Sequence, residues 1–326
     1  MKHLYRTLLF SACVVLASSF GASAQSLSYN SGQSVAPGYE GWEEEPDGTK
    51  YFLFGYMNRN WEEELTIPVG PGNSFAPGNP DQGQPTHFLP RRNRFVFRVK
   101  VPAGWVEKDE LVWTLIAPNG KVEKAYASLR TDYKVDDVVK ASETGALGAG
   151  SSSPEVRANK PPVVTVQGPK ALATKVGQPV TVTALVADDG IPKKRAAGLA
   201  GAAVANRGTR SDEAVPTSSD AAPRVNRAMQ PPARATVGKN VGLHLSWFVY
   251  RGGSATFDPI QIKAWEDTRT GANSPWAPIW APPDMPADGK ITAKVTFSEP
   301  GTYVVRGLAD DGALTGSDDV TVTVSK

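Results

Sequence analysis

Alternation of apolar and polar residues near the C-terminus constrains the fold of this chain more than any other feature. In "DDVTVTV" (318–324), Val320, Val322 and Val324 alternate with threonines. Successive side chains of a β-strand point to opposite faces, so this period of two predicts a strand with one buried face. The pattern recurs in "QPVTVTALVADDG" (178–190). The sequence therefore predicts an all-β protein.

The first 24 residues carry the features of a cleaved secretory signal peptide. Lys2 and Arg6 precede an apolar run at 8–17, and the small residues "ASA" at 22–24 end the segment. No later apolar stretch approaches the roughly 20 residues that cross a bilayer. We therefore expect a secreted, periplasmic or cell-surface protein without a transmembrane segment.

Cysteine content and charge exclude several classes of function. Cys13 is the only cysteine and lies in the signal, so the mature chain has no disulfide and no thiolate metal site. The formal charge of +2 falls to near zero once Lys2 and Arg6 are removed. Because a dominant basic face is missing, we expect no nucleic-acid partner.

The chain is predicted to contain two β-sandwich-like domains. The stretch "ASETGALGAGSSSPEVRANK" (141–160) is small, polar and free of aromatic residues, which is typical of a flexible linker. It separates an N-terminal β-domain at 25–140 from a C-terminal domain at 161–326. The N-terminal domain contains strand-like runs at 51–57, 94–101, 110–116 and 122–129.

Two connections of the N-terminal domain can be predicted in more detail. Asn119 and Gly120 lie between two strand-like runs and favour a hairpin with a type I′ turn. Residues 68–90 are so rich in Pro and Gly that we expect a long surface loop, and such loops often carry function.

The C-terminal domain follows the order of an immunoglobulin-like β-sandwich. Tyr303 follows the "EPG" corner, where such a sandwich places a tyrosine whose hydroxyl bonds back to the backbone. Residues 191–238 are rich in Ala, Gly, Pro and Arg, and we expect them to form a long disordered insertion. The strand-like runs lie at 161–168, 178–190, 243–250, 290–297, 301–309 and 318–324.

The pattern "NKPPVVTV…VTALVADDG…LSWFVY…TFSEPGTYVVRGLADDGALTGSDDVTVTV" resembles bacterial polycystic-kidney-disease (PKD) and related immunoglobulin-like repeats. The resemblance covers about 159–326 apart from the insertion. It implies a non-catalytic domain that acts as a spacer, displays other parts of a protein, mediates adhesion or binds glycans. The N-terminal stretch "FGYMNRNWEEELTIPVG…QGQPTHFLPRRNRFVFRV" resembles parts of uncharacterised secreted bacterial proteins, which implies no activity.

Two "ADDG" sequences, at 187–190 and 309–312, end strands that run in the same direction in an immunoglobulin-like sandwich. The turns after them are therefore expected to meet at one end of the domain. Asp and Gly are common turn residues, and that explanation is sufficient by itself. Alternatively, their carboxylates offer hard oxygen ligands for calcium, from Asp188, Asp189, Asp310 and Asp311.

Three tryptophans form a second candidate site. Trp265, Trp276 and Trp280 lie in the Pro-rich segment "AWEDTRTGANSPWAPIWAPPDMP". Aromatic faces on loops can stack on sugars or on proline-rich ligands, because they offer a large rigid area at low entropic cost. They can equally pack as a satellite core beneath a long loop.

Two "WEEE" runs, at 42–45 and 61–64, suggest a catalytic alternative. Paired carboxylates can act as acid and base on a glycosidic bond, whereas an acidic, solvated sheet edge needs no such pairing. His87 and His244 accompany no hydrolase motif, and His244 is expected to point away from the core because it alternates with leucines. For "RRNR" (91–94) we expect pairing with acidic residues of its own domain.

We therefore interpret the chain as a non-catalytic binding or structural protein of the periplasm or cell surface. Its expected partner is an extracellular or envelope protein or a glycan, and calcium is the one cofactor that the sequence suggests. Two alternatives stay open: a polysaccharide-acting hydrolase that uses the "WEEE" carboxylates, and a subunit of an envelope complex.

Overall fold

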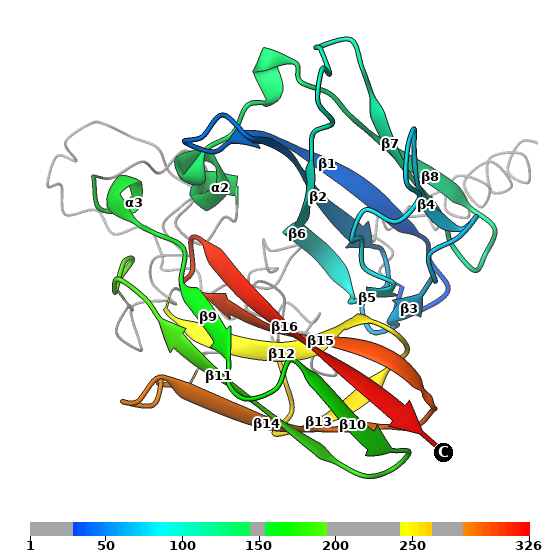
Figure 1. Cartoon of the computed structure of the whole chain (residues 1–326), viewed down its shortest axis with the longest axis vertical. Coiled ribbons are helices and arrows are strands. Elements are labelled where there is room, and N and C mark those ends of the chain that lie inside the picture. Colours follow the sequence, from blue (N-terminus) through cyan, green and yellow to red (C-terminus); the bar gives the residue numbers. More distant parts are fainter. Residues whose placement is uncertain (1–28, 144–153, 194–241, 263–282) are drawn as a thin grey trace, which may run out of the picture.

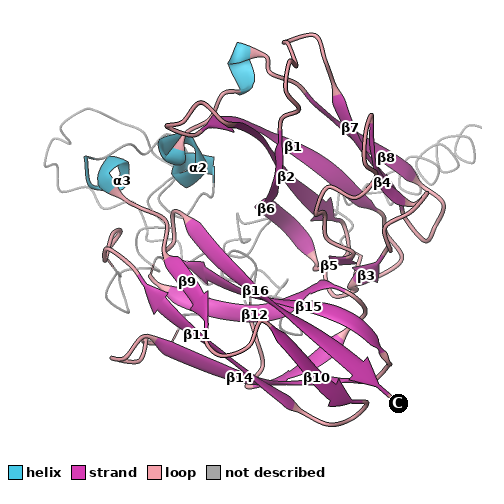
Figure 2. Ribbon diagram, in the orientation of Figure 1, coloured by secondary structure: helices cyan, strands magenta, loops and turns pink. Residues whose placement is uncertain are grey.

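The computed structural model describes residues 29–143, 154–193, 242–262 and 283–326, which are almost entirely β-structure (Figure 1, Figure 2). The all-β class predicted from the sequence is confirmed. The predicted signal peptide, most of the predicted insertion and Trp265, Trp276 and Trp280 lie outside the described residues. Within the described ranges, every helix is too short to cross a bilayer.

Eight described strands form the N-terminal half. One sheet has the order β1-β2-β6, and its strands are β1 (Val35–Glu44), β2 (Lys50–Asn58) and β6 (Arg91–Lys100). A second has the order β4-β7-β8, and its strands are β4 (Asn73–Ala76), β7 (Leu111–Ile116) and β8 (Val122–Ala127). A small third sheet pairs β3 (Leu65–Thr66) with β5 (His87–Phe88).

Aromatic rings fill the core of this half. Trp113 is fully buried and stacks on Phe75, with ring centroids 5.7 Å apart. Phe54 meets Trp113 edge to face at 5.9 Å and stacks on Phe97. Large rings bury much apolar area with few rotatable bonds, which suits a chain that has no disulfide.

The C-terminal half is an immunoglobulin-like β-sandwich of two four-stranded sheets. One has the order β10-β16-β15-β12, and its strands are β10 (Ala171–Lys175), β16 (Thr315–Ser325), β15 (Gly301–Asp310) and β12 (His244–Arg251). The other has the order β13-β14-β11-β9, and its strands are β13 (Ala255–Asp258), β14 (Lys290–Phe297), β11 (Val180–Ala187) and β9 (Val163–Val166).

The core of the sandwich follows the alternation in the sequence. Val320, Val322 and Val324 are buried, and the threonines between them face away from the core. Trp247 is fully buried in the same core cluster as these valines. All six strand-like runs predicted after the linker are strands in the structure.

Tyr303 forms the predicted corner. Its side chain is buried, and its hydroxyl donates to the backbone oxygen of Glu299 at 2.9 Å. Gly252 packs against the ring with a φ of +115°, and a Cβ there would lie 2.5 Å from a ring carbon. The corner therefore requires both the tyrosine and the glycine.

The hairpin between β7 and β8 forms where predicted, but with another turn. Gly120 has a φ of +80°, whereas Asn119 does not have a positive φ. A type I′ turn needs positive φ at both central residues, so that assignment is wrong. Gly120 N instead donates to Ala117 O, as in a type I turn followed by a left-handed glycine, because Pro118 fixes a negative φ at the first central position.

The Pro- and Gly-rich stretch at 68–90 is more structured than a surface loop. It contains β4 and β5, and Phe75 and Phe88 belong to the aromatic core. Asn73 is fully buried, and its side chain forms hydrogen bonds with backbone groups that have no strand partner. The side-chain amide donates to Ile67 O and Pro85 O, and its oxygen accepts from Trp113 Nε1. Side-chain hydrogen bonds of this kind allow a segment with few ladder bonds to be buried.

The predicted linker at 141–160 also contains ordered contacts. The 3₁₀-helix η1 (Thr131–Tyr133) and α2 (Asp137–Glu143) lead into it, and α3 (Pro154–Ala158) lies near its end. Ala141 is buried against Ala313 and Leu314 of the sandwich. The described ends of this stretch therefore pack on the C-terminal half, which the small-residue composition did not indicate.

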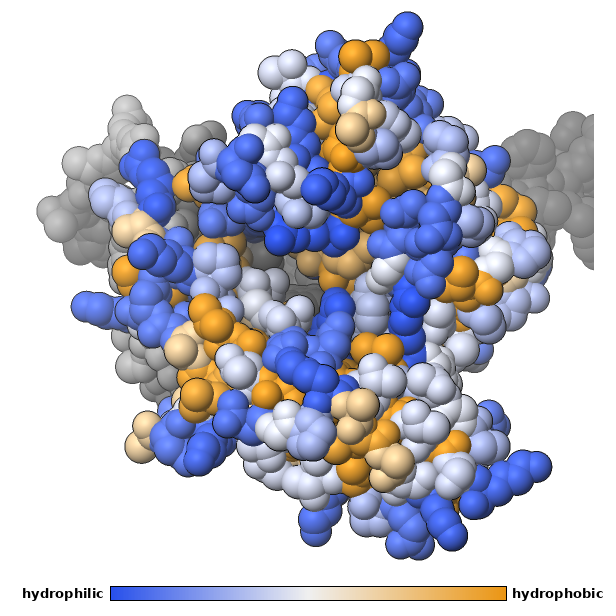
Figure 3. Space-filling model, viewed as in Figure 1, coloured by the Kyte–Doolittle hydropathy of each residue, from blue (hydrophilic) through white to orange (hydrophobic). Residues whose placement is uncertain are grey.

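The two halves face each other across the outer face of the β10-β16-β15-β12 sheet (Figure 1). Figure 3 shows a hollow between the upper and lower parts on this side of the molecule. Beside it, a loop and strand β6 of the N-terminal half form hydrogen bonds with β12 and β15. The polar contacts between the two halves lie at this junction.

Candidate functional site

The two "ADDG" turns lie at the same end of the sandwich, as expected from their strands. Residues Asn159 and Lys160 lie between them. Lys160 N donates to Asp189 Oδ2 at 3.0 Å, and Asn159 Nδ2 donates to Asp311 Oδ2 at 3.0 Å. The chain entering β9 therefore joins the two turns.

The aspartates of both turns accept hydrogen bonds from backbone N–H groups that follow them. Gly190 N donates to Asp188 and Ile191 N to Asp189, both at 2.9 Å. Gly312 N donates to Asp310, and Asp311 Oδ1 accepts from two successive N–H groups. These are the local bonds by which Asp makes turns.

A calcium site needs six to eight oxygen ligands that converge on one point. In the ranges that the structure describes, no three His, Cys, Asp or Glu side chains are grouped so that they could hold a metal ion. The geometry thus favours the turn explanation, and calcium binding by Asp188, Asp189, Asp310 and Asp311 stays a prediction.

The second turn is strongly desolvated. Asp310 and Asp311 are each 1% exposed. Burial raises the pKa of Asp311 to about 6, although three N–H donors favour its charged form. Burial also raises the pKa of Asp188 in the first turn.

The "WEEE" runs lie at opposite ends of β2. The first ends β1 beside the turn to β2, and the second follows the far end of β2. Nine strand residues separate them by roughly 30 Å, whereas a glycosidase holds its two carboxyl groups within about 10 Å. The two runs therefore do not form the acid–base pair of the hydrolase alternative.

Each run is also occupied by local contacts. Glu43 pairs with Arg98 and Lys140, and Glu44 pairs with Lys134 at 2.7 Å. In the second run Glu63 accepts from Gly32 N, and Glu64 pairs with His87 at 2.8 Å. The "RRNR" residue Arg92 pairs with Glu40 at 2.6 Å, so the expected pairing within the domain is confirmed for that residue.

The histidines are both buried. His87 lies between Glu64 and Thr66, whose Oγ1 is 3.0 Å from its Nδ1. His244 lies on the opposite face of β12 from Leu245, as expected, but it is only 3% exposed. The expectation that His244 points away from the sandwich core is therefore confirmed, and its burial shows that the outer face of the sheet is covered at this position.

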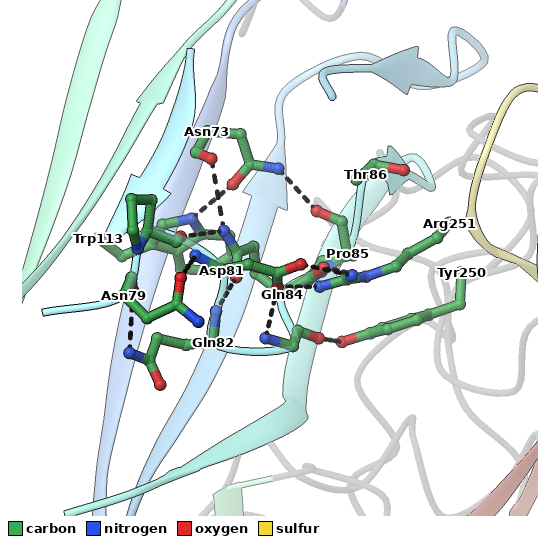
Figure 4. Close-up of polar contacts among 12 residues, drawn as sticks. Asn73, Asn79, Asp81, Gln82, Gln84, Pro85, Thr86, Trp113, Tyr250 and Arg251 are labelled. Atoms are coloured by element: carbon green, nitrogen blue, oxygen red, sulfur yellow. Dashed lines mark hydrogen bonds and ion pairs between the residues drawn. The ribbon is translucent and has the colours of Figure 1, made fainter. Parts of the chain in front are cut away.

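Sequence reasoning missed a polar junction between the two halves. Arg251 at the end of β12 forms two hydrogen bonds with Asp81, at 3.0 and 2.6 Å, and donates to Gln84 O (Figure 4). The Tyr250 hydroxyl donates to Gly83 O, as Figure 4 also shows. The hydrogen bonds from Arg251 lower the pKa of Asp81, so this ion pair is held in its charged form.

Arg306 on β15 forms the second part of the junction. Its guanidinium pairs with both carboxylate oxygens of Asp319 at 2.7 and 2.8 Å. It also donates to Val96 O of β6 and lies 3.6 Å from the ring centroid of Tyr250. Burial raises the pKa of Tyr250 to about 12, and the nearby arginines oppose that rise. Only the alternation of "YVVRGLA", which sends Arg306 outward, hints at this contact in the sequence.

The sequence matches no protein-family model and no curated protein. Among solved structures, it is similar to fibronectin(III)-like modules of Clostridium thermocellum CbhA, with 9% identity over 90% of this chain and 94% of that chain, and a TM-score of 0.21. The D00-D0 domain of intimin has 10% identity over 89% and 100% of the two chains, with a TM-score of 0.22.

Domains 4 and 5 of the S-layer protein SbsC are similar at 9% identity over 90% of this chain and 98% of that chain, with a TM-score of 0.22. Similarity at this level carries no argument about function. The assignment of an immunoglobulin-like sandwich rests on the strand order, the core and the tyrosine corner described above.

Proposed function

We propose that this chain is an exported, non-catalytic binding or structural protein of the periplasm or cell surface. In this proposal residues 1–24 direct export. A β-domain at 25–140 and a PKD-type sandwich at 161–326 are joined through 141–160, and a disordered basic segment at 191–238 is inserted in the sandwich. The partner is an envelope or extracellular protein or a glycan.

The observation that carries the proposal is the partly buried polar junction between the halves. Hydrogen bonds to charged groups are about twice as strong as neutral ones, and a bidentate pair fixes orientation as well as distance. Arg251 with Asp81, and Arg306 with Val96 O, therefore resist rotation of one half against the other, while the pairing of Arg306 with Asp319 within the sandwich orients the Arg306 guanidinium. Fixed orientation suits a protein that spaces or displays a binding surface.

The arrangement of the acidic runs supports a non-catalytic role. Glu43 and Glu64 are paired with cations or histidine at opposite ends of β2. These glutamates form ion pairs on the surface of the N-terminal half, and they lie too far apart to act together in one catalytic cleft.

Export is tested by following the tagged full chain in intact cells. We expect it outside the cytoplasm, with a mature N-terminus at Gln25. As a matched control, Leu9→Lys interrupts the apolar run and is expected to keep the chain in the cytoplasm with its first 24 residues attached. Cytoplasmic location of the unaltered chain would contradict the proposal.

Partner binding is tested by photocrosslinking in the same cells. A photoreactive residue at the exposed position Tyr126 or Val163 is expected to give a light-dependent adduct with an envelope component, whereas the buried position Trp247 gives none. An adduct of fixed stoichiometry indicates a complex subunit, and adducts only with cell-surface material indicate an adhesin.

The enzymatic alternative has its own test. Hydrolysis of a glycan panel by the mature chain, lost in Glu62→Gln and Glu64→Gln, would replace the proposed role with that of a hydrolase.

A further inference from the structure

The sheet β4-β7-β8 of the N-terminal half has two different faces. Its inner face carries Phe75, Trp113 and Leu115 of the aromatic core. Successive side chains of a strand alternate between the faces, so the residues between these core positions point outward. The strand register arranges the outward side chains in three rows across the sheet: Ala76 with Val112 and Tyr126, Ser74 with Thr114 and Lys124, and Ile116 with Val122.

The first and third rows are apolar, and much of their surface is in contact with solvent. Tyr126 is 53% exposed and Val122 is 51% exposed. Val112 and Ile116, directly opposite them on β7, are half-buried. Every residue of β8 is paired with β7, so the Tyr126 ring lies on a fixed backbone. A ligand that covers these rows therefore removes apolar surface from water without first ordering a loop.

The middle row and the Tyr126 hydroxyl supply polar groups for a ligand. Lys124 is exposed, and its ammonium has no ion-pair partner among the described residues. The hydroxyls of Ser74, Thr114 and Tyr126 likewise have no hydrogen-bond partner in that part of the chain. A ligand can therefore bind all of these groups without displacing a contact of the protein.

The charge of this face is positive. Lys124 is the only charged residue that the three strands direct outward. Glu123 points to the inner face and pairs with Lys121 at 2.7 Å. Glu110 precedes β7 and is separated from Lys124 by the row that contains Tyr126. A carboxylate beside Lys124 would thus meet a cation with no competing acid in the same row.

The size of the face favours a narrow ligand over a protein. A stable protein interface has about 20–30 residues and about 800 Å² on each side, which is far more than the short rows of this sheet provide. An exposed tyrosine ring offers a flat apolar surface with a polar hydroxyl at its end, which suits the apolar side and the hydroxyls of a sugar ring. A lysine among free hydroxyls suits a sugar chain that also carries carboxylates.

We propose that the outer face of the β4-β7-β8 sheet binds an anionic glycan. A sugar ring stacks on Tyr126, and a carboxylate of the same chain pairs with Lys124. The hydroxyls of Ser74 and Thr114 bind sugar hydroxyls between them. The inference names the partner class and the surface for the binding role proposed above, and it rests on that proposal.

The test is isothermal titration calorimetry of the full mature chain at low salt. Tetragalacturonate is the anionic glycan probe. Its methyl ester keeps the sugar rings without the charge, and tetraglutamate keeps carboxylates without the rings. We expect tetragalacturonate to bind most tightly, the ester to bind about fivefold more weakly, and tetraglutamate not to bind. Added salt should weaken the binding of tetragalacturonate to that of the ester, because exposed charges are screened.

Variants connect the binding to this face. Tyr126→Ala removes the ring and is expected to weaken tetragalacturonate binding about tenfold, whereas Tyr126→Phe keeps the ring and should stay within about threefold of the unaltered chain. Lys124→Gln should bind the acid and the ester equally. Lys290→Gln is the matched control, because Lys290 is an exposed strand lysine of the other half.

Several results would overturn the inference: no binding of tetragalacturonate at millimolar concentration, equal binding of tetraglutamate, or unchanged binding in Tyr126→Ala. Equal binding of the acid and the ester by the unaltered chain would also contradict it. Val163 lies in the sandwich, so crosslinking there and export are read independently. Normal export with a Val163 adduct but without glycan binding would remove this inference alone, whereas cytoplasmic location would remove the proposed function.

Discussion

Residues 187–190 and 309–312 have the same sequence, Ala-Asp-Asp-Gly, and form turns at the same end of one sandwich. Their environments differ. Asp189 is exposed and accepts two N–H bonds, whereas Asp311 is 1% exposed and accepts three. Identical local sequence therefore gives similar turns with different solvation.

The difference comes from residues that are distant in the chain. Asn159 bonds to Asp311, and Ala141 packs against Ala313 and Leu314. Among the described residues of that stretch, Lys160 donates its backbone N–H to the first turn. A four-residue motif thus determines turn geometry, while the covering chain determines which carboxylate is desolvated.

The largest effect that tests this comparison is expected from Asp311→Ala. Three N–H groups, from Ala313, Leu314 and Asn159, lose their acceptor in a buried site, and each costs about 1 kcal/mol or more. Asp311→Asn is the matched control because it keeps an acceptor oxygen. The asparagine oxygen still accepts from Ala313 N and Leu314 N but not from Asn159, so in urea denaturation we expect the alanine variant to be about 2 kcal/mol less stable than the asparagine variant. Equal stabilities would mean that water reaches this turn.

The next effect is the pH dependence that Asp311 confers. Its pKa of about 6 in the folded chain lies above its ordinary value of 3.8. The folded state therefore binds the proton more tightly, and the contribution of Asp311 is most favourable below pH 3.8 and is lost as pH rises through 6. We expect a loss of about 2 kcal/mol between pH 4 and 7 after allowance for residual solvent screening.

The measurement compares the unaltered chain with Asp311→Asn, because other carboxyl groups titrate in both. The pKa values of Asp81 and Asp318 are lowered, so those groups lose stabilising contributions as pH falls. Subtracting the unfolding free energy of one protein from that of the other at each pH removes the contributions of Asp81 and Asp318. A difference in unfolding free energy that stays constant from pH 4 to 7 would contradict the raised pKa.

A smaller effect is expected for the same substitutions in the first turn. Asp189→Ala and Asp189→Asn are expected to differ by about 1 kcal/mol or less, because water can replace the lost acceptor at an exposed side chain. The same urea titrations measure it. A difference as large as that at Asp311 would show that covering residues are not the cause.

Much of the fold could be predicted from short-range pattern. Period-two alternation identified six of the eight described C-terminal strands, all but β10 and β13, and the "EPG" corner identified Tyr303. Strand β1 was missed because Pro37, Gly38 and Gly41 interrupt its pattern, and the strand has an irregular register at that point. Strand β4 was missed because it lies in a stretch rich in Pro and Gly. Its burial depends on hydrogen bonds from the Asn73 side chain, which take the place of a longer strand ladder and leave no periodic pattern in the sequence.

The candidate sites were harder to predict. That the "ADDG" turns meet follows from strand direction, but their unequal burial depends on Asn159 and Ala141. The junction joins Asp81 to Arg251, 170 residues apart, and neither residue belongs to a recognisable motif.

The smallest expected effect is that of calcium on the two turns. Asp189 and Asp311 accept N–H groups at both carboxylate oxygens, and Asp188 and Asp310 each accept a following backbone N–H, so ion binding would have to displace most of these donors. We therefore expect the melting temperature of the mature chain to be the same with chelator and with millimolar calcium. A site saturated at about a hundred times its Kd would add roughly 2.7 kcal/mol and shift the midpoint by several degrees. Such a shift, lost in Asp310→Ala but kept in Asp47→Asn, would make the turns an ion site and their shared location functional. Without it, the aspartates are turn residues.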